Sequence, residues 1–346
     1  GPHATFVWRG EADTVFLRHF IYGLPSELPF TRIDGTDLWF CMVEVPAKSR
    51  IEYKLIVVRD GNREWIRDPL NRRLAHDPFG ANSACYGEGY ERPLWIEPDP
   101  EVRPGTLSEH TIHLTPFGEP RQITIYKPAR FVESSRYPLL IVHDGGDYLR
   151  FAAMKTILDN LIHRDEVQPL IACFSHPGNR LDEYPDDVRH VEFIADVLLP
   201  KLEKHLPVYG TPRSRCLMGA SFGGVAALSV AWRRPGVFGK LLLQSGSFAF
   251  TDIGTHTRGA AFDPVVAFMN KFRSDPGKPS QQVFVSCGMY ETLIYENRSI
   301  VPLLQGMGMD VRYRWARDGH NWENWRDRQR EALSWLFPGH LWMTYE

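Results

Sequence analysis

Apolar strands and helices alternate through the second half of the chain, and this alternation restricts the fold more than any other feature. The expected strands are short apolar runs at 137–143, 170–175, 215–219, 240–245, 282–287 and 311–315. The expected helices lie at 151–163, 188–205, 223–233, 265–271, 297–306 and 321–336. Strands that are apolar throughout are buried on both faces, which is typical of parallel sheets covered by helices. We therefore expect an α/β fold with a mostly parallel central sheet, preceded by an antiparallel pair at 111–114 and 122–127.

The residues before Pro93 follow a different pattern. Short runs rich in Val, Ile, Phe, Tyr and Trp, separated by Gly, Pro, Asp and Asn, lie at 5–8, 14–18, 38–45, 51–59 and 64–66. No helical period competes with them, so they predict a small all-β sandwich. Prolines at 93, 98, 100 and 104 follow, and such segments behave as stiff spacers. We expect a sandwich domain over 1–92, a linker over 93–106 and an α/β domain over 107–346.

The charge of the chain argues against nucleic acid as a partner. The formal net charge is -2, and acidic and basic residues are interspersed without a long block of one sign. A nucleic-acid-binding domain carries a basic patch, and blocks of like charge favour polyanion or membrane partners. No apolar stretch reaches the ~18 residues of a membrane span. We expect neither nucleic acid nor a membrane as a partner.

The cysteines and histidines point to no cofactor and no metal. The five cysteines are odd in number and include no C-x-x-C pair, which argues against a disulfide framework or a zinc knuckle. The thirteen histidines include no H-E-x-x-H motif and no close His/Asp cluster. No signal peptide is visible, which favours a cytoplasmic location. Gly1-Pro2-His3 resembles the remnant of an expression tag, so a natural leader could have been removed.

A candidate nucleophile lies in Gly219-Ala220-Ser221-Phe222-Gly223, which matches G-x-S-x-G. The motif follows a predicted strand and opens a helix of small residues, which is the strand–turn–helix context of a nucleophile elbow. The glycines allow a strained turn in which bulky neighbours would clash with the strand or the helix. We expect Ser221 to be the nucleophile, exposed at a helix N-terminus that favours negative charge.

A serine hydroxyl is a weak nucleophile on its own and needs a base. In elbow enzymes the order along the chain is serine, acid, histidine. His320 follows the expected strand at 311–315 through a short loop and precedes the last helix, so we expect it to be the base. His256 lies in a predicted loop and His340 beyond the last helix, which makes both poorer candidates.

The acid is expected just after the preceding strand. Glu291 follows the strand at 282–287 and is the favoured candidate, because it would fix the tautomer of His320 and stabilise its imidazolium. Asp318 is a competitor by its proximity in sequence, although a residue two before the histidine seldom points at its Nδ1. Asp263, which follows an earlier strand, is a second competitor.

The oxyanion hole and part of the substrate site are expected around two loops. The backbone N–H of Phe222 is one expected oxyanion donor. The second donor comes from the loop after 137–143, where either Gly146 or Asp147 could supply the N–H. Asp144 and Tyr148 of the same loop are candidate substrate contacts. A simple Asp-Gly turn is the structural alternative for this loop.

Arg180 is a further candidate, because it lies in a loop after the strand at 170–175. Loops at the carboxyl ends of parallel strands form the entrance of ligand-binding sites in α/β folds. It could bind an anionic group such as a carboxylate as a bidentate donor, or form a structural ion pair with Glu183. Trp322 could stack on an aromatic acyl group or belong to the core, as could Trp325. The loop-like stretch 77–83 could cover the active site or close the first domain.

Together these residues resemble the Putative esterase branch of α/β hydrolases, and within it the enterochelin (ferric enterobactin) esterases most. The matching pieces are His143-Asp144-Gly145, Arg180 with Glu183, the elbow Gly219–Gly224, Gly288 with Glu291, and the run Gly319-His320-Asn321-Trp322-Glu323-Asn324-Trp325. The N-terminal part resembles the immunoglobulin-like module of these enzymes through Phe6–Gly10, Leu38-Trp39, Tyr53-Lys54 and Asp68–Asn71. The resemblance implies an α/β-hydrolase fold behind an immunoglobulin-like sandwich.

The resemblance implies a serine esterase that works through an acyl-enzyme on a siderophore or catechol-type ester, a small-molecule substrate. Feruloyl or acetyl esters on carbohydrate are the alternative, because this branch changes substrate through its loops. A glycan-binding protein with a vestigial hydrolase domain is the alternative of another class, and a complete Ser/Glu/His set argues against it. Acyl transfer in place of hydrolysis, and a homodimer, stay open.

Overall fold

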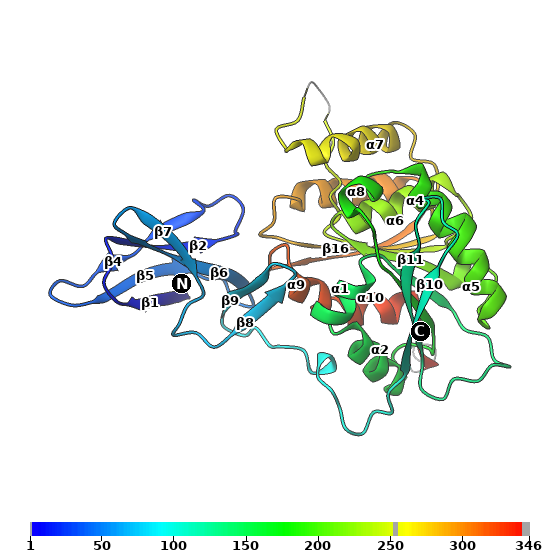
Figure 1. The fold of residues 1–346 in the computed structure, drawn as a ribbon, viewed down its shortest axis with the longest axis horizontal. Coiled ribbons are helices and arrows are strands. Elements are labelled where there is room, and N and C mark those ends of the chain that lie inside the picture. Colours follow the sequence, from blue (N-terminus) through cyan, green and yellow to red (C-terminus); the bar gives the residue numbers. More distant parts are fainter. Residues whose placement is uncertain (1, 252–254, 341–346) are drawn as a thin grey trace. The chain divides into compact units, whose positions relative to one another are not determined.

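The computed structural model describes residues 2–251 and 255–340 (Figure 1). By its internal contacts the chain forms two compact units. The first comprises 1–92 together with two short segments, 288–292 and 315–324, and the second comprises 93–287, 293–314 and 325–346. The domain limits at 92 and 106 stay a prediction.

The first unit has an all-β body in two sheets. One has the strand order β1-β5-β4, and the other has the order β3-β2-β6-β9-β8 with β7 paired to β6. Their core consists of alternate inward residues such as Phe6, Trp8, Leu17, Tyr53 and Leu55. The strands are β1 (His3–Arg9), β2 (Thr14–His19), β3 (Glu27–Pro29), β4 (Thr31–Arg32), β5 (Leu38–Glu44), β6 (Arg50–Arg59), β7 (Asn62–Ile66), β8 (Leu74–Asp77) and β9 (Gly80–Tyr86). The expected all-β region is confirmed.

One prediction for this unit was wrong: 77–83 is not a loop. Its residues belong to the hairpin of β8 and β9, in which Asp77 pairs with Gly80 and His76 with Ala81. The small and polar residues of β9 carry little intrinsic strand preference. Pairing with the buried strand β6, where Ile51 lies opposite Cys85, supplies the order instead.

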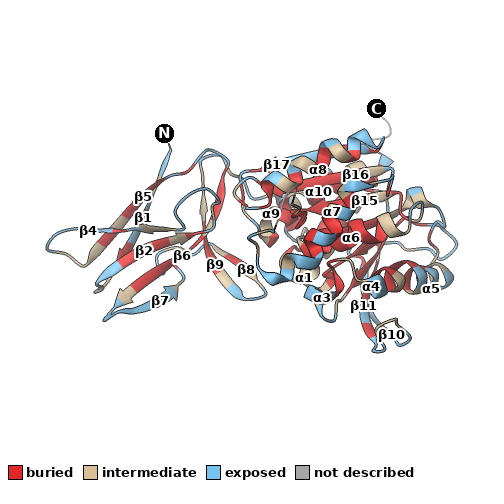
Figure 2. Ribbon diagram, turned by 90° about the horizontal axis from the view of Figure 1, so that it is seen from above, coloured by how far each residue is buried: buried red, intermediate tan, exposed pale blue. Residues whose placement is uncertain are grey.

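The second unit is built on an eight-stranded sheet with the order β10-β11-β13-β12-β14-β15-β16-β17. The neighbours from β13 through β12, β14 and β15 to β16 are parallel, while β10 and β11 are antiparallel. Figure 2 shows that buried residues dominate its central strands. The strands are β10 (Thr106–Ile112), β11 (Arg121–Lys127), β12 (Leu139–Val142), β13 (Ile171–Ser175), β14 (Arg215–Ala220), β15 (Lys240–Gln244), β16 (Gln282–Gly288) and β17 (Asp310–Ala316). The predicted α/β-hydrolase fold class is therefore confirmed.

Helices fill the connections between these strands. They are α1 (Gly145–Phe151), α2 (Met154–His163), α3 (Arg180–Glu183), α4 (Val188–Glu192), α5 (Leu199–His205), α6 (Phe222–Arg233), α7 (Asp263–Ser274), α8 (Ile294–Gly306), α9 (Trp322–Asp327) and α10 (Gln329–Leu336). A π-helical stretch, Phe193–Leu198, joins α4 to α5, so the long helix expected at 188–205 is one continuous element. Short 3₁₀ turns lie at Leu94–Ile96, Pro212–Ser214 and Ala260–Phe262.

Two expected helices are divided. The helix expected at 151–163 is preceded by α1, and α1 and α2 meet at Ala153, whose φ of 49° is incompatible with a continuous helix. The helix expected at 321–336 is split into α9 and α10 at Arg328. The proline-rich segment is also more ordered than a free spacer, because Asn160 Nδ2 donates to the carbonyls of Trp95 and Glu97, both at 2.8 Å.

Candidate active site

Ser221 lies in the turn between β14 and α6, as the motif predicted. Its φ of 55° and ψ of -122° are strained for a residue with a side chain. The turn is tight enough that a Cβ on Gly219 would lie 2.2 Å from the carbonyl oxygen of Gly223. Ser221 also donates its backbone N–H to the carbonyl of Gln244 at 3.0 Å, which ties the turn to β15.

Strained backbone is repeated at the carboxyl ends of three adjacent strands. Asp144 follows β12 with φ 53°, Ser221 follows β14 with φ 55°, and Ser245 follows β15 with φ 45°. Non-glycine residues in this region cost about 1–3 kcal/mol each, and they cluster at functional sites where the surrounding structure holds them. The edge of the sheet formed by these three strand ends is therefore the best-marked candidate site in the second unit.

The hydroxyl of Ser221 has a neighbour that the sequence did not reveal. Its Oγ lies 3.2 Å from the Oγ of Ser247, which is 1% exposed. Ser247 also donates its backbone N–H to the carbonyl of Ser221 at 3.1 Å. Its one sequence signal was its position three residues beyond β15, where side chains gather at the carboxyl edge of the sheet.

The expected oxyanion donors lie at two helix starts. Phe222 is the first residue of α6 and Gly146 the second of α1, and N–H groups in a first helical turn have no carbonyl partner within their own helix. Asp147, the other candidate, donates its N–H to the carbonyl of Asp144 at 3.0 Å. The geometry therefore favours Gly146 over Asp147 as the second donor.

Arg180 opens α3 and pairs with the loop after β12. Its Nε donates to Oδ1 of Asp144 at 2.8 Å, and its Nη2 donates to the carbonyl of Ala220 at 3.3 Å. The structural ion pair proposed with Glu183 was wrong, because Glu183 instead accepts from Nη2 of Arg121 at 2.6 Å. Arg180 thus links the strained Asp144 to the residue before Ser221, and 32% of its side chain stays exposed.

Burial and charge shift the ionisation of this group. Burial is the largest influence and would lower the pKa of Arg180, but the charge of Asp144, the hydrogen bond to it and smaller contributions from Tyr184 and Asp147 together raise that pKa above its ordinary value. Burial first, and then the charge of Asp144, raise the pKa of the Asp147 carboxyl. Arg180 is therefore a fixed cation in this part of the molecule.

His320 and Glu291 form a direct pair within the first unit. The Nδ1 of His320 lies 2.7 Å from Oε2 of Glu291, and Glu291 is only 3% exposed. The other carboxylate oxygen, Oε1, accepts the backbone N–H of Gly288 at 2.6 Å. A buried carboxylate on Nδ1 fixes the tautomer in which Nε2 can accept a proton.

The two competing acids are engaged elsewhere. Asp318 accepts from Nη1 of Arg50 at 3.0 Å. Asp263 lies 2.9 Å from Nε2 of His256. Glu291 is therefore the carboxylate that the described part of the structure brings to His320.

The aromatic candidates are mostly part of the core. Tyr148 is 0% exposed and donates its hydroxyl to Oε1 of Gln244 at 2.9 Å. Trp325 is buried and donates its indole N–H to Oγ of Ser245 at 2.9 Å. Trp322 is 9% exposed. Burial on this scale favours a packing role for these rings over contact with a substrate.

Clusters of candidate metal ligands and membrane-spanning helices are both absent from residues 2–251 and 255–340. No group of three or more His, Cys, Asp or Glu side chains there could hold a metal ion. No helix in the same ranges is long and apolar enough to cross a membrane.

The family of the chain follows from comparison with known proteins. The model of the family described as Putative esterase matches residues 115–336, more than half of the chain and the whole region from the elbow to His320. The chain belongs to the Putative esterase family. As a member of an esterase family with an α/β-hydrolase fold, it is an ester hydrolase.

Individual relatives agree with this membership. The iron(III) enterobactin esterase of Dickeya dadantii is 24% identical, over 89% of this chain and 79% of that protein. The ferric enterobactin esterase of Salmonella typhimurium has a similar fold, with a TM-score of 0.78, 20% identity, and coverage of 96% and 93% of the two chains. A ferulic acid esterase from Anaeromyces mucronatus matches with a TM-score of 0.55 and 15% identity, over 69% of this chain and 93% of its own. The resemblance predicted from the motifs is confirmed.

Proposed function

We propose that this esterase works through an acyl-enzyme formed on Ser221. In this mechanism the Oγ of Ser221 attacks the ester carbonyl while Nε2 of His320 takes its proton. His320 then returns the proton to the leaving alcohol, and Glu291 stabilises the imidazolium meanwhile. Water, deprotonated by the same histidine, hydrolyses the acyl-enzyme and restores the serine.

The observation that carries this proposal is the strained backbone of Ser221 at the elbow. A positive φ on a non-glycine residue persists only where the surrounding structure imposes it. Here the strain exposes a hydroxyl at the start of α6, between two other strained strand ends. The N–H groups of Phe222 and Gly146 are the proposed oxyanion donors.

The assignment of base and acid rests on topology and on the pair itself. Glu291 and His320 each follow the carboxyl end of a strand of the eight-stranded sheet, β16 and β17, as Ser221 follows β14. The 2.7 Å contact between Glu291 and Nδ1 of His320 supports a base that is oriented before substrate binds.

For the substrate, we propose a catecholate siderophore ester. The enterobactin esterases similar to this chain carry that substrate in their names, and their similarity extends over most of both chains. Arg180, a partly exposed cation beside the elbow, suits an anionic catecholate. Asp144 holds Arg180 in place, so we propose an indirect role for Asp144.

The experiment compares wild type with Ser221→Ala on p-nitrophenyl butyrate, followed by a panel of esters. We expect a burst of nitrophenol and steady turnover in wild type, and a loss of ~10³-fold or more in the variant. Within the panel, kcat/KM should be highest for a ferric catecholate trilactone. Equal turnover by both proteins would disprove the role of Ser221.

A feruloyl or acetyl ester on carbohydrate is the second candidate. The similarity to a ferulic acid esterase favours it, although that match covers 69% of this chain and the enterobactin esterase match covers 96%. A higher kcat/KM on methyl ferulate than on the trilactone would decide for it. We also propose that the protein acts in the cytoplasm and needs no nucleic acid, membrane or cofactor as a partner. Analytical ultracentrifugation would test whether it is a homodimer.

A further inference from the structure

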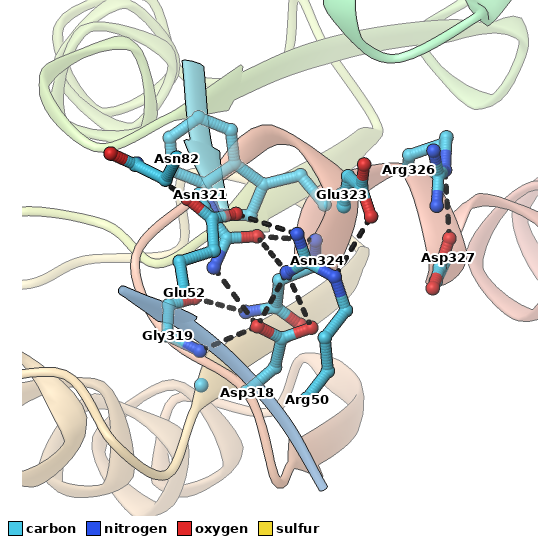
Figure 3. A network of polar contacts seen from close by, with 12 residues as sticks. Arg50, Glu52, Asn82, Asp318, Gly319, Asn321, Glu323, Asn324, Arg326 and Asp327 are labelled. Atoms are coloured by element: carbon cyan, nitrogen blue, oxygen red, sulfur yellow. Dashed lines mark hydrogen bonds and ion pairs between the residues drawn. The ribbon is translucent and has the colours of Figure 1, made fainter. Parts of the chain in front are cut away.

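Arg50 is a fully buried cation at the start of β6, in the N-terminal sandwich. Figure 3 shows its guanidinium at the centre of a polar network. Its side chain is 0% exposed and faces three carboxylates: Glu52 at 2.6 Å, Asp318 at 3.0 Å and Glu323 at 2.8 Å. A buried arginine is expensive to desolvate and is retained only where its partners compensate for the lost water.

The partners of Arg50 lie on both sides of His320 along the chain. Its Nη1 donates to Asp318, two residues before the histidine, and to Oδ1 of Asn321, one residue after it, at 2.9 Å. Oδ1 of Asp318 also accepts the backbone N–H of Gly319 at 2.7 Å. The residues that flank His320 are thus fixed directly or through Asp318 by one guanidinium.

The backbone of the same strand holds the same loop. Arg50 donates its own N–H to the carbonyl of Arg317 at 2.9 Å. Arg317 in turn donates from Nη1 to the carbonyl of Ala47 at 2.7 Å. The start of the loop that carries His320 is therefore held to the N-terminal sandwich by hydrogen bonds of both the main chain and a side chain.

The loop that carries Glu291 is held in a similar way. The hydroxyl of Tyr290 lies 2.6 Å from Oγ of Ser49, and its carbonyl accepts the N–H of Tyr22 at 2.7 Å. The N–H of Tyr290 also donates to the carbonyl of Asp318 at 3.1 Å, which joins the two loops to each other. A Cβ on Gly288 would lie 2.3 Å from that same carbonyl, so the approach of the loops is close.

The choice of arginine fits this geometry. A guanidinium has five N–H donors in a rigid plane and can hold several acceptors at fixed angles. A lysine ammonium is a point charge on a flexible stem and would not fix the same set. A packing role alone would need no charge at this position, whereas a role in aligning the loop needs the directed donors.

We propose that Arg50 is a positioning residue for His320, so that the N-terminal sandwich fixes the position and orientation of the proposed base relative to its acid. This inference rests on the proposed function of His320 and Glu291 and assigns the sandwich a part in that chemistry. Arg50 contacts the residues beside His320 along the chain. It acts through Asp318 and Asn321, which set the path of the chain on either side of the histidine.

A matched pair of variants tests the proposal. Asp318→Asn and Glu52→Gln each remove one buried carboxylate from Arg50, but only Asp318 lies in the His320 loop, while Glu52 lies on β6 and accepts from Asn82. We expect Asp318→Asn to lower kcat ~10–100-fold with little change in KM, as for residues that orient a functional group. Glu52→Gln should stay near wild type.

Two readouts separate positioning from simple stability. The first is the acid limb of the pH profile of kcat/KM, which should shift in Asp318→Asn and not in Glu52→Gln. The second is the low-field NMR resonance of the proton between Nδ1 of His320 and Glu291, identified by its loss in His320→Gln. It should move or broaden in Asp318→Asn and in Arg50→Met, and Arg50→Lys should restore it in part.

The outcomes are decisive in either direction. Equal loss of kcat in Asp318→Asn and Glu52→Gln, a rise in KM alone, or an unchanged NMR resonance in a folded Asp318→Asn protein would overturn the proposal. If Arg50→Met does not fold, the comparison of Asp318→Asn with Glu52→Gln still tests the proposal. If Ser221→Ala keeps full turnover, the proposed function fails, but the NMR readout still reports whether Arg50 positions His320.

Discussion

The two halves of the proposed catalytic machinery are built in different ways. Ser221 lies in a turn whose shape comes from local residues, because Gly219 and Gly223 allow β14 and α6 to meet closely. His320 and Glu291 lie in loops that contact polar partners more than two hundred residues away in the sequence, among them Arg50 and Ser49. A nucleophile can thus be specified by local residues, whereas a base and an acid on the loops after β16 and β17 are supported by residues from elsewhere in the sequence.

The largest expected effect concerns the base and its acid. Replacing His320 by Gln should lower kcat ~10⁴-fold, because His320 is the proposed acceptor of the proton from Ser221. Glu291→Gln should cost less than His320→Gln but still at least ~10²-fold, since the imidazole loses its oriented tautomer. Steady-state kinetics on p-nitrophenyl butyrate would check both. A Glu291→Gln protein with wild-type turnover would indicate a Ser–His dyad instead.

The next effect compares the stability contributed by the buried network around Arg50 with that of an exposed ion pair in the same sandwich. Arg50→Met leaves buried carboxylates without their cation and should lower the free energy of unfolding by ~3–5 kcal/mol. Arg63→Met, which removes an exposed ion pair to Glu27 in the same sandwich, should cost at most ~1 kcal/mol. Urea denaturation of the two variants would measure the difference. Similar losses of unfolding free energy in both variants would show that the network around Arg50 stabilises the fold no more than an exposed ion pair does.

A third effect concerns pH. Burial, only partly offset by Arg50, raises the pKa of Asp318 from 3.8 to about 6. The folded protein therefore binds this proton more tightly than the unfolded chain, so Asp318 favours folding at low pH, and this contribution is lost as pH rises from about 4 to about 6. The loss corresponds to ~3 kcal/mol. The free energy of unfolding of wild type, relative to Asp318→Asn, should fall by about this amount over that range. A difference that is constant with pH would contradict the shift.

The smallest expected effect belongs to the elbow. Ser247→Ala removes the hydroxyl 3.2 Å from the Oγ of Ser221, a neutral hydrogen bond that contributes about 0.5–1.5 kcal/mol. We therefore expect kcat to change less than ~10-fold, with the pH profile unchanged. A loss as large as that of His320→Gln would mean that Ser247 takes a direct part in proton transfer.

The sequence was most informative where structure is local. The strands β12 to β16 were predicted because each is an apolar run, and Ser221 because its motif joins a strand to a helix of small residues. Glu291 and His320 could be predicted from their positions after β16 and β17. These features depend on periodicity and on order along the chain, both of which a single sequence displays.

The sequence was least informative where partners are distant. Arg50 begins an apolar strand and has no motif around it, so its three carboxylate partners could not be foreseen. The pairing of Arg180 with Asp144, not Glu183, depends on how the loops after β12 and β13 fold back. The hairpin of β8 and β9 was missed because it owes its order to β6, and its own residues carry little strand preference.

Chemical labelling tests the proposed role of Ser221 as nucleophile most directly. Wild-type protein would be treated with a fluorophosphonate, which modifies activated serines, and its peptides analysed by mass spectrometry. If Ser221 is the nucleophile, we expect one equivalent of label on the peptide that contains Ser221, no label in Ser221→Ala, and slow labelling in His320→Gln. Label on another residue, or none on a protein that hydrolyses esters, would contradict it.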